Sequence, residues 1–428
     1  MRYWQKFRLD LLICTAFLML PLLLLADVTF GGKTMLPVDN LYQWEPWASA
    51  AEEQGITTPQ NPLISDLIIQ NYNWRKFTKE SFLEQGEIPL WNPYLFAGVP
   101  FLAAGQHSAY YPLSLLFFLM PIPAAYGWFA LLQLWLTGVF MYLFARVLGT
   151  GRGGATIAGL VYQGSGFMLT STAVFPMIIA AAAWLPLLLA CIELIIRRDW
   201  RLDSGDSAAN HRSPISQSPL IWVAVGAIAL GLQIFAGHVE ITYYTLLIMG
   251  LYAAYRLLTN RPSPITALFR QAGWLAAMVA LGLMLGAVQL VPLFELGQVN
   301  FRQDATTFEQ VQSYAFPVRR VLTLAMPNFY GNPAHHSTVD PFTGQTIPFT
   351  VDAQGNPNPT SEWGIKNYVE GGIYLGILPL LLAVLGAVGG WLAGSRRRIH
   401  TVFFAGLSFL SLAFIFGTPL YAIIYYGL

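Results

Sequence analysis

Two acidic residues recur in the same local pattern within the first hundred positions of the chain. Each begins an Asp-x3-Gln-x3-Trp spacing, formed by Asp39, Gln43 and Trp47 and again by Asp66, Gln70 and Trp74. On a helix this spacing places an acid, an amide and an aromatic ring along one stripe. A carboxylate held in this way can remove a proton from a hydroxyl group or bind a metal ion. Asp66 and Asp39 are therefore the candidate catalytic residues.

The same pattern also fits a purely structural role. Pro37 and Pro62 precede the two acids, and aspartate and serine are favoured at helix N-caps. Tryptophan rings settle at the level of membrane headgroups. Two capped helices lying along a membrane interface would have this sequence without any catalytic role, and the two interpretations are compatible.

Several arginines could bind a phosphate group, because the planar guanidinium forms paired hydrogen bonds with phosphate oxygens. The candidates are Arg75, Arg302, Arg319 and Arg320. Contact with lipid headgroups or solvent is the simpler alternative for each one. We assign Arg75 and Arg302 to substrate binding.

His238 and Glu240 lie between two apolar segments, where an ionisable side chain is costly and marks a functional hypothesis. The histidine could donate a hydrogen bond to phosphate, or the pair could help to hold a divalent cation. The alternative is that both side chains reach into the interface. His335, His336 and Asp340 have metal-ligand types too, but turn-rich loops commonly carry such residues without a metal. The sequence therefore does not identify metal ligands, and a divalent cation is the one cofactor that these residues could bind.

The composition places the chain in a membrane. Only 11% of its 428 residues are charged and 55% are hydrophobic, whereas an ordinary soluble domain has about 25% charged residues. A net charge of +1 provides no basic field for nucleic acid. Cys14 and Cys191 lie inside apolar runs, which argues against disulfide and zinc sites.

Nine apolar segments are long enough to cross a bilayer, which takes roughly 20 residues. We expect an all-α polytopic membrane protein with spans near 9–26, 126–148, 155–172, 174–196, 219–237, 241–258, 272–294, 371–394 and 400–418. The first is expected to be an uncleaved anchor. The segment 112–121 is too short to cross, and we expect it to be re-entrant or interfacial.

Basic residues in the short loops predict the orientation. They form one alternating set that contains Arg2, Lys6, Arg8, Arg146, Arg152, Arg197, Arg198, Arg201, Arg212, Arg256, Arg261, Arg270 and Arg396–Arg398. Because cytoplasmic loops are enriched in Lys and Arg, the N-terminus is expected in the cytoplasm. The long loops 28–125 and 295–370 then face outward. The first is expected to contain interfacial helices, and the second turns and a small hairpin.

Proline, glycine and polar aromatic residues are concentrated in the second half of the first loop. This composition is unsuited to an amphipathic helix and is typical of an ordered, non-helical loop that contacts a substrate. Trp91, Asn92 and Gln106 are the expected contacts.

At these motifs the chain resembles the YfhO-like family of bacterial membrane proteins, which is placed with the C-type (GT-C) glycosyltransferase superfamily. The matching stretches are 61–75, 89–94, 98–102, 106–112, 237–240, 317–331 and 371–376. The run Pro-Leu-Trp-Asn-Pro-Tyr at 89–94 is the most specific.

The resemblance implies a GT-C-like helical bundle, and a transferase that moves a sugar from a polyprenyl-phosphate carrier to an envelope glycan or lipid acceptor. It implies a multi-pass protein of the bacterial inner membrane. An acid in the first outer loop commonly acts as base or metal ligand in this superfamily, and Asp39 and Asp66 could fill that role. The chain is expected to be a single membrane domain over 1–428 that lacks the C-terminal part of the family.

Two other function classes stay open. A transporter or flippase of a lipid-linked precursor would place polar groups at mid-bilayer on broken helices. Here the polar candidates gather at the expected outer face, which favours the enzyme modestly. A non-catalytic membrane scaffold is the third possibility.

Overall fold

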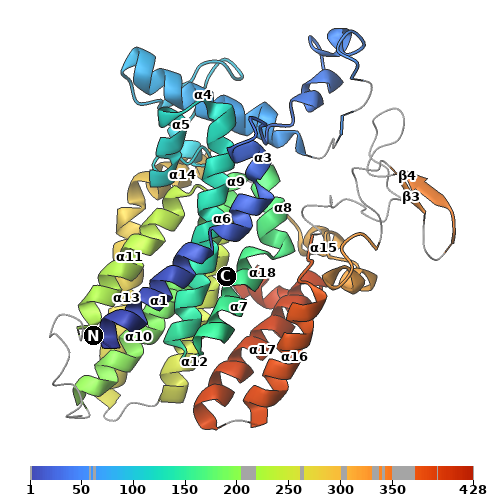
Figure 1. Cartoon of the computed structure of the whole chain (residues 1–428). Helices are drawn as coiled ribbons and strands as arrows, with labels where there is room; N and C mark the ends of the chain where they lie inside the picture. Colours follow the sequence, from blue (N-terminus) through green and yellow to red (C-terminus); the bar gives the residue numbers. More distant parts are fainter. Residues whose placement is uncertain are drawn as a thin grey trace. The chain divides into compact units, whose positions relative to one another are not determined.

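The computed structural model describes residues 2–56, 59–60, 64–203, 218–260, 265–299, 306–329, 337–339, 343–348, 372–392 and 394–427 (Figure 1). Their contacts divide the chain into two compact units. Unit 1 contains Met1–Leu36, Asp66–Gly164 and Phe175–Asn300, and unit 2 contains Pro37–Ser65, Ser165–Val174 and Phe301–Leu428. Helices make up most of the described residues of both units.

Unit 1 begins with a helix in three pieces and continues through a mixed loop into long helices. Its elements are α1 (Arg2–Ala16), α2 (Met19–Leu24), α3 (Ala26–Thr29), the π-helix η4 (Leu67–Asn71), α4 (Tyr72–Glu80), the π-helix η5 (Ser81–Gln85), β1 (Trp91–Asn92), β2 (Val99–Pro100), the 3-10 helices η6 (Leu102–Ala104) and η7 (Pro112–Leu115), α5 (Leu116–Leu119), α6 (Ile122–Val147), α7 (Arg152–Gln163), α9 (Pro176–Ala182), α10 (Leu185–Asp203), α11 (Pro219–Phe235), α12 (Val239–Asn260), α13 (Ile265–Leu285) and α14 (Ala287–Gln298).

Unit 2 is built from three separate stretches of the chain. Its elements are the 3-10 helices η1 (Val38–Gln43) and η2 (Ala48–Ala50), α8 (Gly166–Val174), α15 (Phe308–Ser313), the 3-10 helix η10 (Val318–Leu324), β3 (Ser337–Val339), β4 (Thr346–Pro348), α16 (Ile377–Leu392), α17 (Ser395–Ile415) and α18 (Tyr421–Gly427). Strands β3 and β4 pair antiparallel, with Thr338 opposite Ile347. This confirms the small hairpin expected in the second long loop.

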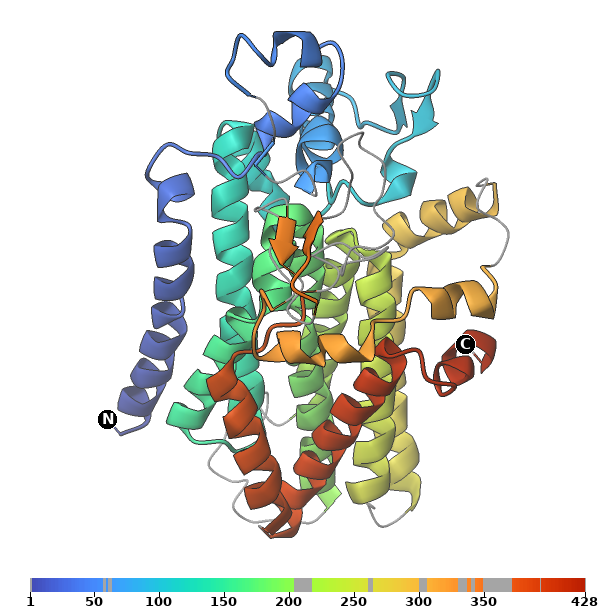
Figure 2. The ribbon, with the colours of Figure 1, turned by 90° about the vertical axis from the view of Figure 1, so that its right-hand side faces the viewer.

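The long helices of unit 1 lie side by side, with α11 against α13 and α10 against both α6 and α11 (Figure 2). Glycine allows the closest approach. A Cβ added at Gly226 would lie 2.2 Å from the Met278 sulfur, and one at Gly282 would lie 2.7 Å from a Leu230 methyl carbon. Small residues at such interfaces let backbones pack closely where no hydrophobic effect drives helices together.

Five helices in the described part of the chain are long and apolar enough to cross a membrane. They are Ile122–Val147, Pro176–Arg197, Val239–Asn260, Ile265–Leu285 and Arg398–Ile415, and the apolar helices Pro219–Phe235 and Ile377–Leu392 are shorter. The helical membrane architecture is thus supported, while the count of nine crossings stays a prediction. Four expected spans are interrupted: 9–26 divides among α1, α2 and α3, 155–172 divides at Gly164–Ser165, 174–196 divides at Ala183–Trp184 between α9 and α10, and 272–294 divides at Gly286.

Buried glutamines satisfy backbone carbonyls at these interruptions. Gln163 donates to the carbonyls of Phe17, between α1 and α2, and of Leu134, at 2.9 Å each. Gln233 donates to Ala181 at 3.0 Å, and the hydroxyl of Tyr162 donates to Ala182 at 2.9 Å, where α9 ends. Because an apolar medium offers no hydrogen bonds to a free carbonyl, the chain closes its own helix breaks.

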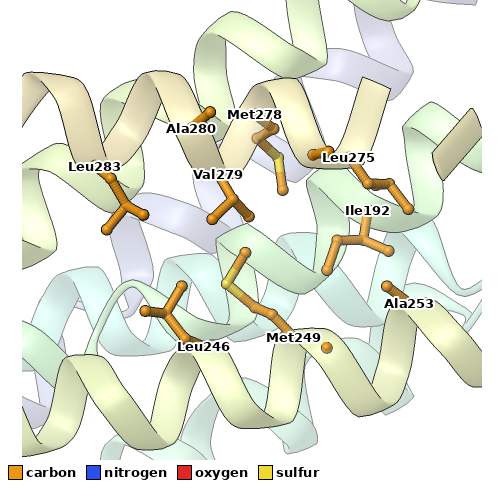
Figure 3. A pocket seen from close by; sticks show the side chains of 11 residues that line it. Ile192, Leu246, Met249, Ala253, Leu275, Met278, Val279, Ala280 and Leu283 are labelled. Carbon is orange, nitrogen blue, oxygen red and sulfur yellow. The ribbon is translucent and has the colours of Figure 1, made fainter. Parts of the chain in front are cut away.

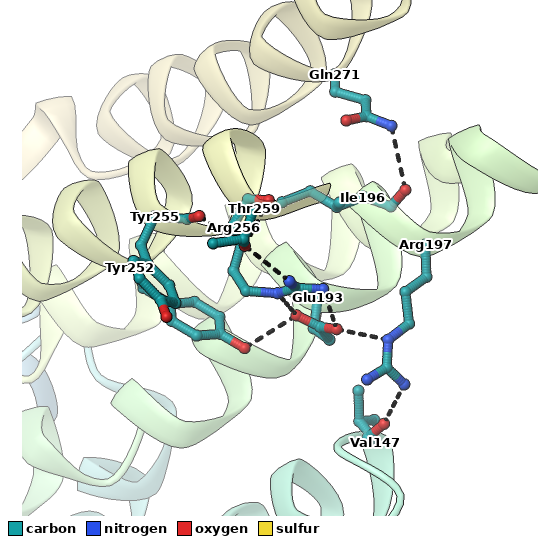
Figure 4. Close-up of polar contacts among 9 residues, drawn as sticks. All are labelled: Val147, Glu193, Ile196, Arg197, Tyr252, Tyr255, Arg256, Thr259 and Gln271. Atoms are coloured by element: carbon teal, nitrogen blue, oxygen red, sulfur yellow. Dashed lines mark hydrogen bonds and ion pairs between the residues drawn. The ribbon is translucent and has the colours of Figure 1, made fainter. Parts of the chain in front are cut away.

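A buried ionic cluster joins α10, α12 and the end of α6 (Figure 4). The carboxylate of Glu193, which is wholly buried, accepts bonds from Arg256 Nε at 2.7 Å and Nη2 at 2.9 Å, and from the Tyr252 hydroxyl at 2.9 Å. Arg197 pairs with the same carboxylate and donates to the Val147 carbonyl at 2.6 Å. Every charge here has a partner, so the cluster fixes the helix ends.

Asp10 holds the first helix in a similar way. Its carboxylate accepts hydrogen bonds from Arg152 at 3.0 and 2.8 Å and from the hydroxyl of Tyr142. These bonds tie α1 to α6 and α7. Asp10, an acid in the first apolar segment, therefore has a structural role.

Candidate functional site

Asp66 lies at the start of one continuous helical segment formed by η4, α4 and η5. It is half-buried, and its Oδ1 accepts a hydrogen bond from Gln70 Nε2 at 3.2 Å. The expected contact between acid and amide is therefore present. Burial raises the pKa of the Asp66 carboxyl, and the bond from Gln70 opposes the rise. The side chain makes no N-cap hydrogen bond. A carboxylate with a raised pKa is a stronger base than an ordinary aspartate.

Asp39 has a different environment, in the 3-10 helix η1 of unit 2. Its Oδ2 accepts the backbone N–H of Gln60 at 2.7 Å, which closes the turn-rich segment between them. Gln43 donates to Asn40 at 2.7 Å, and η1 ends before Trp47. The repeated spacing therefore does not produce a repeated structure. Asp39 stabilises a loop, whereas Asp66 begins a helix.

Arg75 is a buried charged residue of unit 1, with 3% of its surface exposed. It lies on the face of α4 that packs against α6. Nη1 donates to Ser114 Oγ at 3.0 Å, and the guanidinium carbon lies 4.3 Å from the centre of the Phe117 ring. Burial lowers the pKa of Arg75 to about 10, partly offset by the nearby Tyr126 hydroxyl. The side chain therefore stays charged at neutral pH.

Polar neighbours of Arg75 are fixed by hydrogen bonds among themselves. The Tyr126 hydroxyl donates to Asn71 Oδ1 at 2.7 Å, and Ser114 Oγ donates to the Ser108 carbonyl at 2.7 Å. Tyr111, in the same loop, donates to Gln133 Oε1 at 3.1 Å. The buried face of α4 thus packs against polar side chains that are held in place by their own hydrogen bonds.

His107 is a structural histidine within this loop. Nδ1 accepts the backbone N–H of Ala109 at 2.9 Å, so Nε2 carries the proton and donates to the Leu102 carbonyl at 3.2 Å. The Phe101 ring stacks on the imidazole at 4.7 Å. Burial lowers the pKa of His107 to about 4, which keeps it neutral at physiological pH. Both nitrogens are committed to holding the loop.

The loop around Gln106 docks on the junction between α11 and α12. Ser108 Oγ donates to the Ala236 carbonyl at 2.6 Å. Gly237 has a φ of +87°, and a Cβ there would lie 2.5 Å from the Gly105 carbonyl oxygen. The backbone contact brings the segment of Gln106, whose side chain is exposed, next to that of His238. These two predicted substrate contacts therefore lie on neighbouring segments.

His238 and Glu240 differ in exposure. His238 is half-buried, and burial lowers its pKa while the nearby Glu240 carboxylate opposes that shift. Its Nδ1 accepts the backbone N–H of Ile241 at 3.4 Å. Glu240 is exposed in the first turn of α12. The histidine is thus a neutral group at a helix junction, with Nε2 left to carry its proton.

Trp91 and Asn92 form strand β1 of a short hairpin with β2. Asn92 is buried, and its Oδ1 accepts the backbone N–H of Tyr94 at 2.9 Å, so it forms the turn. The half-exposed Trp91 indole lies over Gly98, where a Cβ would be 2.3 Å from the ring nitrogen. An ordered non-helical loop was expected here and is present, although Asn92 is occupied by the turn.

An apolar groove opens between α12 and α13, with Ile192 of α10 at its floor (Figure 3). Its volume is about 550 Å³. The lining is entirely apolar and consists of Ile192, Leu246, Met249, Gly250, Ala253, Leu275, Ala276, Met278, Val279, Ala280 and Leu283. Leu246 lies six residues beyond Glu240, or about 9 Å of helix. The groove suits a hydrocarbon chain.

Several sequence candidates fall outside this arrangement. Arg302, His335, His336 and Asp340 lie outside the described residues. Arg319 is exposed, and Arg320 is buried with its guanidinium 5.6 Å from the Phe316 ring. Among the residues that the structure describes, no three His, Cys, Asp or Glu side chains gather as a metal site.

Sequence reasoning missed Asn71, Ser114, Tyr126 and Glu193. Tyr126 and Glu193 could have been noticed, since each is a polar residue inside an apolar segment. Asn71 and Ser114 carry no such signal, because their roles come from the fold of the loop.

Comparisons of the chain with family models, curated proteins and solved structures find no match.

Proposed function

We propose that the chain is a membrane glycosyltransferase that moves a sugar from a polyprenyl-phosphate carrier to a cell-envelope acceptor on the extracytoplasmic face. The observation that carries the proposal is the helical segment from Asp66 to Gln85. It presents a half-buried carboxylate of raised pKa and, nine residues later, a buried cation, Arg75. A base for the acceptor and a positive group for the departing phosphate are the two charges that this reaction needs.

In the proposed reaction, the acceptor hydroxyl gives its proton to Asp66 as its oxygen bonds to the anomeric carbon of the sugar. The bond between that carbon and the phosphate oxygen breaks, and its electron pair leaves with the carrier phosphate. A cation compensates the charge that develops on this phosphate. The Asp66 proton then passes to solvent. Asp39, which holds a loop, is not assigned a step.

The remaining predicted contacts have supporting roles in the proposal. Gln106, His238 and Glu240 lie on two segments that touch, which suits the binding of a polar sugar beside the first loop. Trp91 would supply an exposed ring for stacking on that sugar. Arg302 stays a proposed phosphate contact.

The proposal includes the orientation predicted from the basic loops, with nine crossings and a cytoplasmic N-terminus in a bacterial inner membrane. It also places the prenyl chain in the groove between α12 and α13. Eleven apolar residues and a volume of about 550 Å³ fit a segment of hydrocarbon and offer no partner to a polar group.

A transporter or flippase of a lipid-linked precursor is the second candidate. The interrupted helices favour it, since transporters build their sites at such breaks. However, the carbonyls of Ala181 and Ala182 accept bonds from Gln233 and Tyr162. These bonds satisfy carbonyls that the break between α9 and α10 would otherwise leave without a partner, so this break does not need an ion to stabilise it.

One reconstitution separates the candidates. The purified chain is placed in liposomes with a radiolabelled polyprenyl-phosphate sugar and an extract of envelope acceptors. We expect label to move to the acceptor fraction as a new glycosidic bond. Movement of intact donor between leaflets without a new bond would identify a flippase and contradict the transferase. If neither activity is observed, the non-catalytic membrane scaffold is the remaining interpretation.

A further inference from the structure

Two buried arginines in unit 1 have opposite environments. Arg256 is 6% exposed, and it forms a two-point bond with the Glu193 carboxylate and a further bond with Thr259 at 3.2 Å. Arg75 is 3% exposed, and its neighbours are neutral hydroxyl groups: Nη1 donates to Ser114 Oγ at 3.0 Å, and the Tyr126 hydroxyl is a second contact. Its Nε and Nη2 have no acceptor among the residues that the structure describes. Arg256 therefore has a carboxylate partner, whereas Arg75 has no anionic partner among the described residues.

The surroundings of Arg75 explain how an unpaired charge persists there. The Phe117 ring lies 4.3 Å and the Phe129 ring 5.6 Å from the guanidinium carbon. Aromatic faces attract a cation but do not accept the in-plane N–H bonds of Nε and Nη2. A buried charge without a counterion destabilises the folded state. A buried guanidinium whose Nε and Nη2 have no acceptor among the described residues is suited to bind an anion.

We propose that Arg75 is the anchor of a closed phosphate-binding site beneath the first loop. Its Nε and Nη2 would bind two oxygens of one phosphate group, and the Tyr126 hydroxyl would border the site. The fork of the guanidinium favours a phosphate group over a spherical halide. The choice of a phosphate group as the anion rests on the proposed function, because the lipid carrier supplies a phosphate. The need for some anion does not rest on that function, because it follows from the buried, unpaired guanidinium.

The site is closed in this structure, because Nε and Nη2 are covered. The cover is the segment 108–117, which contributes Ser114 and the Phe117 ring. Ser108, at the start of this segment, is a buried non-glycine residue with a left-handed φ of 52°. Such strain persists where the surrounding structure enforces it and is common at sites that move. Phosphate entry would lift this segment from α4.

Thermal unfolding of the purified chain in detergent tests the site without turnover. The probes are inorganic phosphate, with chloride at equal ionic strength as control, and decyl phosphate, with decanol as control. We expect a saturable rise in Tm of at least about 2 °C with a phosphate probe and none with its control. A response to both phosphates indicates a general phosphate site, and a response to decyl phosphate alone indicates a lipid headgroup.

Variants locate the response. Arg75→Gln should abolish it and, without phosphate, should unfold at the wild-type temperature or above, because an unpaired charge is gone. Lys76→Gln removes an exposed cation from the same helix, and this variant should keep the phosphate-dependent rise in Tm. Should Arg75→Gln fail to fold, Arg75→Lys keeps the charge without the fork and should need more phosphate for the same shift.

Two results would overturn the site: no phosphate-specific shift in the wild type, or an undiminished shift in Arg75→Gln or Arg75→Lys. A wild type that responds to phosphate yet transfers no sugar would contradict the proposed function and leave the site standing.

Discussion

At the scale of single residues, burial separates groups that look alike in the sequence. Arg75 is followed by Lys76 and Lys79, so it belongs to a stretch that predicts solvent exposure. The fold turns Arg75 inward and leaves Lys76 outside. Asp39 and Asp66 share a spacing, but one accepts a loop N–H and the other begins a helix. Spacing could predict the candidate residues, but it could not predict which of them are buried.

The groove between α12 and α13 can be tested by filling it at one residue. A Cβ added at Gly250 meets no atom within 4 Å, so Gly250→Phe should be accommodated and should place its ring in the groove. If the groove holds the prenyl chain, the variant should raise the KM for a long-chain donor several-fold and leave that for a short-chain donor unchanged. Gly273→Phe is the matched control, because Gly273 is equally open but does not line the groove. Equal effects on both donors would contradict this assignment.

At the scale of helices, apolar length predicted where the elements lie but not where they break. The run at 155–172 was expected to be one span, yet it ends one helix at Gln163 and begins another at Gly166, with Gly164 and Ser165 between them. The partners that permit such breaks, Gln163, Gln233 and Tyr162, come from other parts of the sequence. A single-sequence pattern contains no record of these pairings, so it could not predict which side chains satisfy the carbonyls at each break.

The ionic cluster at Glu193 should determine how firmly α10 and α12 are joined. Glu193→Gln leaves Arg256 buried with a weaker partner, and removing one member of a buried pair costs about 3–5 kcal/mol. We expect a clear fall in the Tm of the purified chain. Glu80→Gln, which removes the exposed pair with Lys76, should change stability by less than about 1 kcal/mol. Equal Tm values for the two variants would show that the cluster is not a structural lock.

At the scale of the whole molecule, composition was sufficient to predict a helical membrane protein, because a bilayer requires long apolar helices. The orientation is a separate prediction, from the alternation of basic loops. Single cysteines at Ser204 and Thr343, introduced after Cys14→Ala and Cys191→Ala, can be labelled on intact cells with an impermeant thiol reagent. We expect labelling at 343 and none at 204. The reverse pattern would invert the orientation and place the proposed site in the cytoplasm.

The most direct test of the transferase is the rate of sugar transfer by Asp66→Asn. The amide keeps the shape of the side chain but cannot take a proton, so transfer should fall by about 10²–10⁴-fold at equal protein level. Glu84→Gln, an exposed acid in the same helical segment, should keep wild-type transfer. The wild-type rate should also decline as the pH falls through the raised pKa of Asp66, since only the deprotonated carboxylate is a base. Full turnover by Asp66→Asn would contradict the proposed mechanism.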